Sequence, residues 1–398
     1  MSFAIDPALD ELRLRVRTFV DDHILPAEET ILAEDQATGS SQTLLDLQAK
    51  ARNAGLWTPH LPEAYGGLGL GVMGMCALFR EMGRSLVGAR VFNCDAPDQG
   101  NMDLLLKTAS QPMKDKWLAP LCAGEITSAF CMTEPAPGAG SDPTNLRTKA
   151  VRDGDDWVID GHKWFSTGGG AASFMIVMAR TSDDRRTGCT MFLVDRHADG
   201  IEHVRDVPVM GGAVLQHREA EFLFRGVRVS NDAVLLGEGR GFELAQRRLV
   251  PARLTHCMRW LGWSERALDM CRAYVNERVS FGKPLAKHQA VQAMIARNAL
   301  GIHQGNLMTL HCATLLEAGA GLEAKAYSSM AKLHCAKLLC QLLDDAIQMH
   351  GALGYSEDLP FSKWYRFARS ARIADGPDEV HQMVIAREFL RGRLNVLV

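Results

Sequence analysis

Apolar positions recur at helical spacing through residues 1–128 of the chain. Asp6 can cap a first helix, and Pro7 suits the first helical position, where its missing N–H has no intrahelical partner. A later helical segment ends at Gly55, a residue suited to a helix C-cap. The pattern therefore predicts an N-terminal helical domain over residues 1–128.

Between residues 129 and 236 the pattern changes to short apolar runs separated by polar turns. WVID, FMIVMA, CTMFLV and EAEFLF have β-type composition, and Asp160-Gly161 and Asp199-Gly200 are typical turn pairs. Helices between the runs would favour parallel strands, and this region has none. We expect a central antiparallel, barrel-like sheet.

From residue 237 the helical period returns. Four long amphipathic stretches begin at FELAQRRL, LTHCMRW, HQAVQAM and KAYSSMA, and Pro251 is expected to kink the first. They predict a C-terminal four-helix bundle over residues 237–398. The expected fold class is α+β, mainly α.

Composition narrows the class of protein. The chain has 398 residues, 47% of them apolar and 23% charged, and a formal net charge of −3. A soluble globular protein fits, and a nucleic-acid or anionic-membrane partner is disfavoured. The ten cysteines form no C-x-x-C pair, and the thirteen histidines no H-E-x-x-H, so no metal site is assigned. With no leader or membrane-spanning run, a cytoplasmic location is expected.

GLGVMG, at residues 69–74, matches the dinucleotide fingerprint G-x-G-x-x-G. That fingerprint requires a strand directly before it, whereas the preceding WTPHLPEAYGG contains two prolines and its neighbours are helical in pattern. We interpret the segment as a loop between helices.

Three other segments could bind a ligand, although each has a plain structural alternative. MTEPAPGAGSD, at residues 132–142, could present N–H groups and hydroxyls to an anion or polar ring, or could simply connect two domains. HKWFSTGGG, at residues 162–170, offers aromatics and hydroxyls to a planar cofactor, or is a strand ending in a turn. Arg278, in ERVSFGKPLAKHQ, could bind a phosphate or be a solvated loop arginine.

The segment RIADGPDEVH contains one residue that local rules do not explain. Pro377 can start a helix, where Asp378 and Glu379 favour the positive N-terminal end. Asp375 instead lies before Gly376, at the negative end of the preceding helix, where a carboxylate is disfavoured. A local rule broken at one residue indicates a possible functional role.

Together these segments resemble the acyl-CoA dehydrogenase family. MTEPAPGAGSD resembles its T-E-P-G-A-G-S-D flavin loop, HKWFSTGGG its K-x-W-I-T-N-G-G strand, and RVSFGKPLAKHQ its R-x-x-F-G-x-x-x-x-x-x-Q segment. QMHGALGY resembles Q-x-x-G-G-x-G-Y, and ADGPDEVH the Y-E-G-T stretch that carries the base. NCDAPDQGNMDLL, GEGRGF and HCMR are similar to a branch whose eukaryotic members carry a fused phosphotransferase-like domain, which we expect this chain to lack.

The resemblance implies a cofactor, a substrate and partners. FAD would lie between domains and across a subunit interface, so a homodimer or homotetramer is implied. An acyl-CoA thioester of fatty acid β-oxidation would be the substrate, and an electron-transfer flavoprotein the partner. The implied FAD contacts are Met132, Thr133, Ser141, Phe165, Ser166, Thr167, Arg278, Phe281, Gln289, Gln348, Gly351, Gly376 and Glu379. Ser141, Arg253 and Asp375 would contact the substrate.

Asp375 falls where the family carries its glutamate base. In the implied reaction it removes the proton α to the thioester carbonyl, while the β-hydrogen leaves as hydride to flavin N5. Aspartate reaches one methylene less than glutamate, so the substrate must sit closer. The other base position known in the family aligns with Ala252, which cannot serve.

Two alternatives share the same scaffold. One is an oxygen-using flavoenzyme of the nitroalkane oxidase or flavin monooxygenase type, with which an aspartate base is compatible. The other is a catalytically silent helical binding module, which Asp375, Thr167 and Arg278 argue against, because such a module has no use for them.

Overall fold

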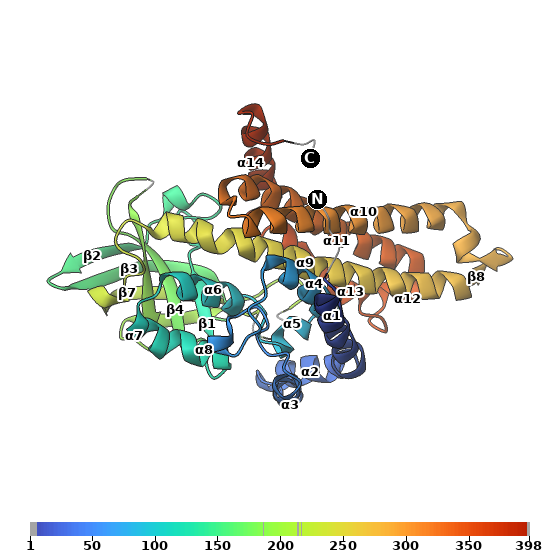
Figure 1. Cartoon of the computed structure of the whole chain (residues 1–398), viewed down its shortest axis with the longest axis horizontal. Helices are drawn as coiled ribbons and strands as arrows, with labels where there is room; N and C mark the ends of the chain where they lie inside the picture. Colours follow the sequence, from blue (N-terminus) through green and yellow to red (C-terminus); the bar gives the residue numbers. More distant parts are fainter. Residues whose placement is uncertain (1–5, 186, 213–214, 216, 396–398) are drawn as a thin grey trace. The chain divides into compact units, whose positions relative to one another are not determined.

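The computed structural model describes residues 6–185, 187–212, 215 and 217–395 (Figure 1). The chain forms two compact units. The first unit comprises Met1–Glu29, Leu70–Val91 and Arg253–Val398, and the second comprises Thr30–Gly69 and Phe92–Ala252. The domain boundaries expected after residues 128 and 236 stay predictions.

The first unit is helical. It contains α1 (Pro7–Phe19), α4 (Val72–Met82), α5 (Gly88–Val91), α10 (Gln289–Glu317), α11 (Gly321–His350), α12 (Ala352–Tyr355), α13 (Phe361–Ala368) and α14 (Asp378–Leu390). Its core gathers large side chains that include Trp263, Phe361 and Trp364. Asp6 accepts the N–H of Ala8 at 2.8 Å and α1 begins at Pro7, so the predicted helix start is confirmed.

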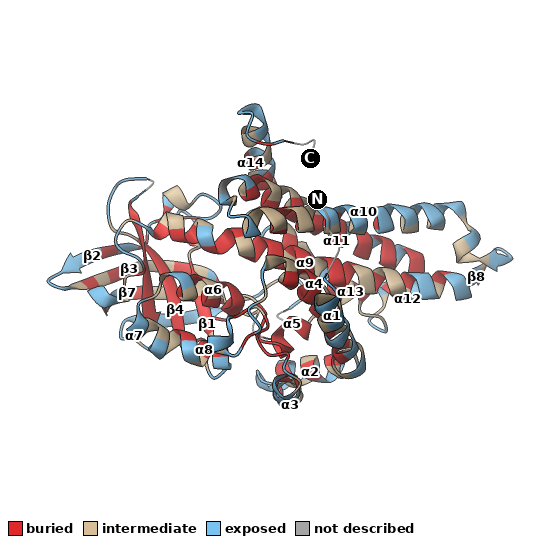
Figure 2. Ribbon diagram, viewed as in Figure 1, coloured by how far each residue is buried: buried red, intermediate tan, exposed pale blue. Residues whose placement is uncertain are grey.

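A small antiparallel hairpin joins α9 (Gly241–Glu277) to α10 in this unit. Its strands are β8 (Val279–Ser280) and β9 (Lys283–Pro284). Figure 2 shows α10 exposed along one face, as expected of an amphipathic helix with only one side in the core.

The second unit contains the sheet. Its strands are β1 (Ser128–Cys131), β2 (Lys149–Asp153), β3 (Asp156–Thr167), β4 (Phe174–Arg180), β5 (Cys189–Asp195), β6 (Ile201–Val207) and β7 (Glu219–Ser230). Its helices include α3 (Gln42–Asn53), α6 (Asp98–Thr108), α7 (Gln111–Met113) and α8 (Ala119–Ala123). Helix α2 (Leu25–Thr38) begins in the first unit and continues in the second.

The sheet is mixed, which corrects the expectation of purely antiparallel strands. β4 pairs in parallel with β1 and with β2, whereas β3, β7, β6 and β5 join by antiparallel ladders. β4 is apolar and buried from Phe174 to Ala179 because both of its faces are covered. Phe174, Ile176 and Met178 belong to one core cluster, and Met175 and Val177 to the other.

The first half of GLGVMG, residues 69–71, lies in the loop between a short 3-10 turn (Glu63–Tyr65) and α4, and residues 72–74 form the first turn of α4. No strand precedes β1 in residues 6–127, all of which the structure describes. The predicted loop between helices is therefore confirmed for residues 69–71, whereas residues 72–74 are helical. None of the helices in the described part of the chain is long and apolar enough to cross a membrane.

Helix α9 (Gly241–Glu277) is a single element of 37 residues. The sequence predicted two helices here, but Pro251 lies inside a continuous helix that passes from the second unit into the first. Within the first unit, α9 crosses α4 at two glycines. A Cβ added to Gly262 would lie 1.8 Å from the carbonyl oxygen of Arg80, and one added to Gly83 would lie 2.3 Å from that of Arg259. Only glycine permits this approach.

We predict that Gly262→Ala destabilises the protein by about 1–3 kcal/mol or more, because the added methyl group meets backbone that cannot rotate away. Gly321→Ala is the matched control, since a Cβ at that helical glycine has nothing within 4 Å. Thermal unfolding of both variants measures the difference. Equal melting temperatures would contradict the close crossing.

Candidate active site

A sharp turn before α14 presents Asp375 in the first unit. Asp375 has φ +54° and Gly376 φ +106°, so both lie in the left-handed region that non-glycine residues avoid. Two cationic side chains hold this backbone. Arg253 Nε donates to the carbonyl oxygen of Asp375 at 2.8 Å, and Lys332 Nζ donates to that of Gly376 at 2.6 Å. Hydrogen bonds from α9 and α11 thus stabilise an unfavourable conformation.

A histidine on α9 contacts the Asp375 carboxylate. The Nε2 atom of His256 lies 3.3 Å from Oδ2 of Asp375, and each side chain is 20% exposed. The other ring nitrogen, Nδ1, lies 2.9 Å from Nη2 of Arg259. The ring also stacks on Trp260, with centroids 5.4 Å apart. The carboxylate is therefore bordered by an ordered polar side chain while remaining partly accessible.

Helix α14 supplies the other side of the turn. Asp378 is buried in its first turn and accepts a hydrogen bond from Nε of Arg372 at 2.7 Å. His381 is buried and packs closely against Gly376. A Cβ atom added to Gly376 would lie 3.0 Å from Nε2 of the His381 ring. Glu379 is exposed in the same turn. The predicted role of Pro377 and Asp378 in starting a helix is confirmed, because α14 begins at Asp378.

Burial changes the protonation of the groups around the turn. It lowers the pKa of Lys332 to about 8, although the Asp378 and Asp375 carboxylates oppose the change. It lowers the pKa of His381 to about 4, and the charges of Lys332 and Arg253 act in the same direction. Near neutral pH, Lys332 is therefore mostly charged and His381 neutral.

In the second unit, a buried ion pair anchors the loop that follows β1. Nζ of Lys163 lies 2.9 Å from Oε1 of Glu134 and 3.0 Å from the carbonyl oxygen of Met132. The carboxylate of Glu134 also accepts backbone N–H groups of Ala139, Arg147 and Thr148. Burial disfavours the charged carboxylate, but the Lys163 charge and these bonds outweigh it and lower the pKa of Glu134 to about 2.

The end of β3 lies beside this loop. The N–H of Trp164 donates to the carbonyl oxygen of Thr133 at 3.1 Å. Phe165 has φ +48° and its residue is 43% exposed, which is unusual for a large aromatic side chain. Thr167 donates to Oε2 of Glu219 at 2.9 Å, and burial raises the pKa of that carboxyl.

These residues fit a flavin. An exposed aromatic ring on a left-handed bulge can stack on a planar cofactor. Half-buried hydroxyls at Thr133 and Thr167, on a backbone fixed by Lys163, can bind its polar edge. Ser166 is buried, whereas Ser141 is exposed in the same loop as Thr133. The structure thus places Met132 and Thr133 beside the strand that carries Phe165 and Thr167, and their contact with a flavin stays a prediction.

The remaining predicted cofactor residues lie in the first unit, around the β8–β9 hairpin. Arg278 follows α9, and Phe281 at the turn of the hairpin is 94% exposed with φ +50°. The stack of Tyr274 on His350, with centroids 4.2 Å apart, joins this end of α9 to the end of α11. Gln289 begins α10, and Gln348 and Gly351 lie at the exposed end of α11, where Gly351 is the predicted C-cap.

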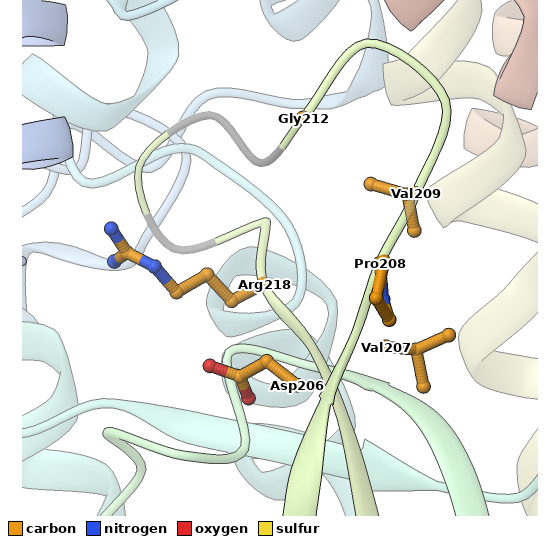
Figure 3. A pocket seen from close by; sticks show the side chains of 6 residues that line it. All are labelled: Asp206, Val207, Pro208, Val209, Gly212 and Arg218. Carbon is orange, nitrogen blue, oxygen red and sulfur yellow. The ribbon is translucent and has the colours of Figure 1, made fainter.

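A surface pocket lies at the junction of β6 and β7 in the second unit (Figure 3). Arg218 borders it and is fixed by Asp35 at 3.1 Å. The residues that line it are Asp206, Val207, Pro208, Val209, Gly212 and Arg218. It therefore contains none of the residues predicted to bind cofactor or substrate.

Residue patterns missed several contributors to the Asp375 turn. Lys332 and His381 lie in helices whose sequence gives no reason to single them out. His256 and Arg259, in the HCMR segment, are three residues apart, as Arg253 and His256 are, which places all three on one face of α9. That spacing is the sequence feature from which their common position on α9 could have been predicted.

Comparisons with known proteins agree over nearly the whole chain. The acyl-CoA dehydrogenase N-terminal, middle and C-terminal domains match residues 6–125, 129–223 and 239–390. A probable acyl-CoA dehydrogenase, FadE2, of Mycobacterium tuberculosis is 37% identical, over 98% of this chain and 97% of that protein. Acyl-CoA dehydrogenase family member 11 of Homo sapiens is also 37% identical, over 96% of this chain and 50% of its own length.

Among solved structures, a putative acyl-CoA dehydrogenase from Mycobacterium abscessus superimposes with a TM-score of 0.93. It is 40% identical, and the match covers 98% of this chain and 99% of that one. Several curated relatives are longer: this chain spans 37% of acyl-CoA dehydrogenase family member 10 of Mus musculus and about half of the family member 11 proteins. The superposition on the Mycobacterium abscessus structure confirms the predicted fold class.

We predict that Glu134→Gln destabilises the protein by about 3–5 kcal/mol, because it leaves the buried Lys163 ammonium without its counter-charge. The control is Glu238→Gln, which removes an exposed ion pair with Arg152 and should cost less than about 1 kcal/mol. Chemical denaturation measures both. Similar losses in the two variants would contradict the anchoring role of the buried pair.

We also predict a pH effect from Glu134. Its folded-state pKa is depressed from 4.5 to about 2, so the stabilisation is present above about pH 4.5 and is lost as the pH falls towards 2. The unfolding free energy of the wild type should therefore fall more steeply in this window than that of Glu134→Gln. Parallel curves from denaturation at several pH values would refute the assignment.

Proposed function

Because the chain belongs to the acyl-CoA dehydrogenase family of oxidoreductases, we propose that it dehydrogenates an acyl-CoA thioester to the enoyl-CoA, with Asp375 as the base. The family is FAD-dependent. The electrons would pass to an electron-transfer flavoprotein. We further propose that the chain acts as a homodimer or homotetramer.

One observation supports the proposal most strongly: a partly accessible carboxylate on a strained turn that three side chains of α9 and α11 hold. Arg253 and Lys332 bond the backbone of the turn, and His256 contacts the carboxylate. A structural aspartate needs no left-handed backbone, since strain of this kind persists only where surrounding structure maintains it and clusters at active sites. A fixed base of this kind suits removal of a proton α to a thioester.

The proton transfer follows from the environment of Asp375. The carboxylate accepts the α-proton as the C–H bond breaks, and the developing charge passes to the thioester carbonyl. Arg253, which holds the base turn, is 8% exposed, so only a small part of its side chain would contact the substrate. Ser141 is proposed to contact the CoA portion or the cofactor.

Bound FAD would supply the hydride acceptor for the β-hydrogen. In the second unit, Met132, Thr133, Phe165 and Thr167 would contact its ring system, whereas Ser166, also predicted from the resemblance, is fully buried and offers no surface to it. The first unit would contribute Gly376 and Glu379 near the base, and Arg278, Phe281, Gln289, Gln348 and Gly351 around the hairpin. The nearly complete exposure of Phe281 is consistent with a contact to the cofactor of a neighbouring subunit.

We expect an anaerobic titration of the FAD-loaded protein with straight, branched and hydroxylated acyl-CoAs to bleach the visible flavin absorption for at least one member. Asp375→Asn should keep flavin but slow bleaching by about 10²- to 10⁴-fold, because the amide cannot accept the proton. Normal bleaching in that variant would exclude Asp375 as the base. A flavin that no thioester reduces, but that oxygen rapidly reoxidises after chemical reduction, would favour an oxygen-using enzyme instead.

A further inference from the structure

His256 lies between a permanent cation and the proposed base, within one compact unit. Its Nε2 atom faces Oδ2 of Asp375 at 3.3 Å, and its Nδ1 atom faces Nη2 of Arg259 at 2.9 Å. Arg259 is one helical turn further along α9, so the helix itself sets this spacing. Each ring nitrogen therefore has a defined neighbour.

The chemistry of the neighbours fixes the tautomer. A guanidinium has only donors and stays protonated in proteins, so Nδ1 must accept the hydrogen bond from Arg259. A neutral imidazole with an accepting Nδ1 carries its proton on Nε2. That proton lies on the nitrogen nearest the Asp375 carboxylate, 3.3 Å from Oδ2. A second proton on Nδ1 would collide with the Arg259 donor, which disfavours the charged ring.

Packing contacts also fix the position of the His256 ring. Trp260 stacks on it with an interplanar angle of 20°. The backbone of Arg259 is pressed against Gly83 of α4, where an added Cβ would lie 2.3 Å from the Arg259 carbonyl oxygen. The donor that faces Asp375 is therefore set by helix packing as well as by hydrogen bonding.

We propose that His256 is a positioning residue for Asp375: Arg259 holds it as the neutral Nε2–H tautomer, and it donates to the carboxylate without exchanging protons. The inference rests on the proposed role of Asp375 as base. A carboxylate rotates easily about its last torsion, so a fixed donor orients it. The same bond favours the ionised form, which keeps the base ready to accept the α-proton. The α-proton stays on Asp375, because Nε2 is already protonated.

Other titratable groups surround the turn and limit the pH range of a test. Facing Asp375 are Arg253 and His256 of α9, Lys332 of α11, and Asp378 and His381 of α14, with Arg372 paired to Asp378. Lys332 titrates near pH 8 and His381 near pH 4, because burial lowers both pKa values. Between about pH 5 and 7, neither of these two obscures a change at Asp375.

The decisive pair of variants is His256→Gln and His256→Phe. A glutamine amide carries one donor and one acceptor side by side, as the neutral ring does, whereas phenylalanine keeps only the ring shape. We expect His256→Phe to slow anaerobic flavin bleaching by about 10- to 100-fold at pH 7, the value of one hydrogen bond to a charged group. The acid limb of its pH–rate profile should move to higher pH. His256→Gln should stay within about fivefold of wild type, with an unshifted limb.

A merely structural role would give another pattern. Both variants would then lose thermal stability or flavin together, and the acid limb would stay where it is in wild type. A wild-type rate and profile in His256→Phe would also overturn the proposal.

A second measurement does not depend on turnover. In FAD-loaded protein carrying ¹⁵N-histidine, the ring resonances of His256, assigned through His256→Gln, should report the Nε2–H tautomer throughout pH 5–7. Arg259→Met should allow the ring to take up a proton in that range. A ring that titrates in the wild type, or carries its proton on Nδ1, would refute the proposal. If no acyl-CoA bleaches the wild type, the proposed function fails, while the tautomer result still decides this inference.

Discussion

A buried lysine ammonium requires hydrogen-bond acceptors. In each compact unit, this requirement fixes one loop of the candidate active site. Lys163 is fully buried and bonds Glu134 and the carbonyl oxygen of Met132. Lys332 is fully buried and bonds the carbonyl oxygen of Gly376. Movement of either loop would leave a charge without partners in a medium of low polarity, which is costly. Each buried lysine therefore holds one irregular segment in place: Lys163 the loop after β1, and Lys332 the turn before α14.

The α4–α9 crossing extends this rigidity to the side chains around Asp375. Gly83 and Gly262 let the two helices approach until backbone meets backbone. Arg253, His256 and Arg259 project from the same part of α9, so their positions follow from helix packing rather than from loop conformation. Side chains on a packed helix are placed more accurately than side chains on loops, which suits groups that must hold a base within hydrogen-bonding distance.

Asp375 illustrates how a sequence anomaly and a structural one coincide. Sequence rules left it unexplained, because a carboxylate is unfavourable at the end of a helix. The structure places it instead on a turn with positive φ, where its backbone conformation also costs energy. Both penalties are offset by the same cationic neighbours, Arg253 and Lys332, which bond the carbonyl oxygens of the turn. These two cations come from distant parts of the chain, so no local pattern could have identified their role.

Local chemistry in the sequence determined the class of each region. The Asp6–Pro7 start of α1, the C-cap at Gly351 and the start of α14 after Pro377 followed from residues whose effect is local. The family motifs indicated Asp375 and the flavin loop in the same way. Tertiary structure alone decided the parallel pairing of β4 with β1 and β2, the continuity of α9 through Pro251, and the contact of His256 with Asp375. Each of these depends on partners far away in the sequence, whose approach is set by packing, and residue patterns do not record which distant groups meet.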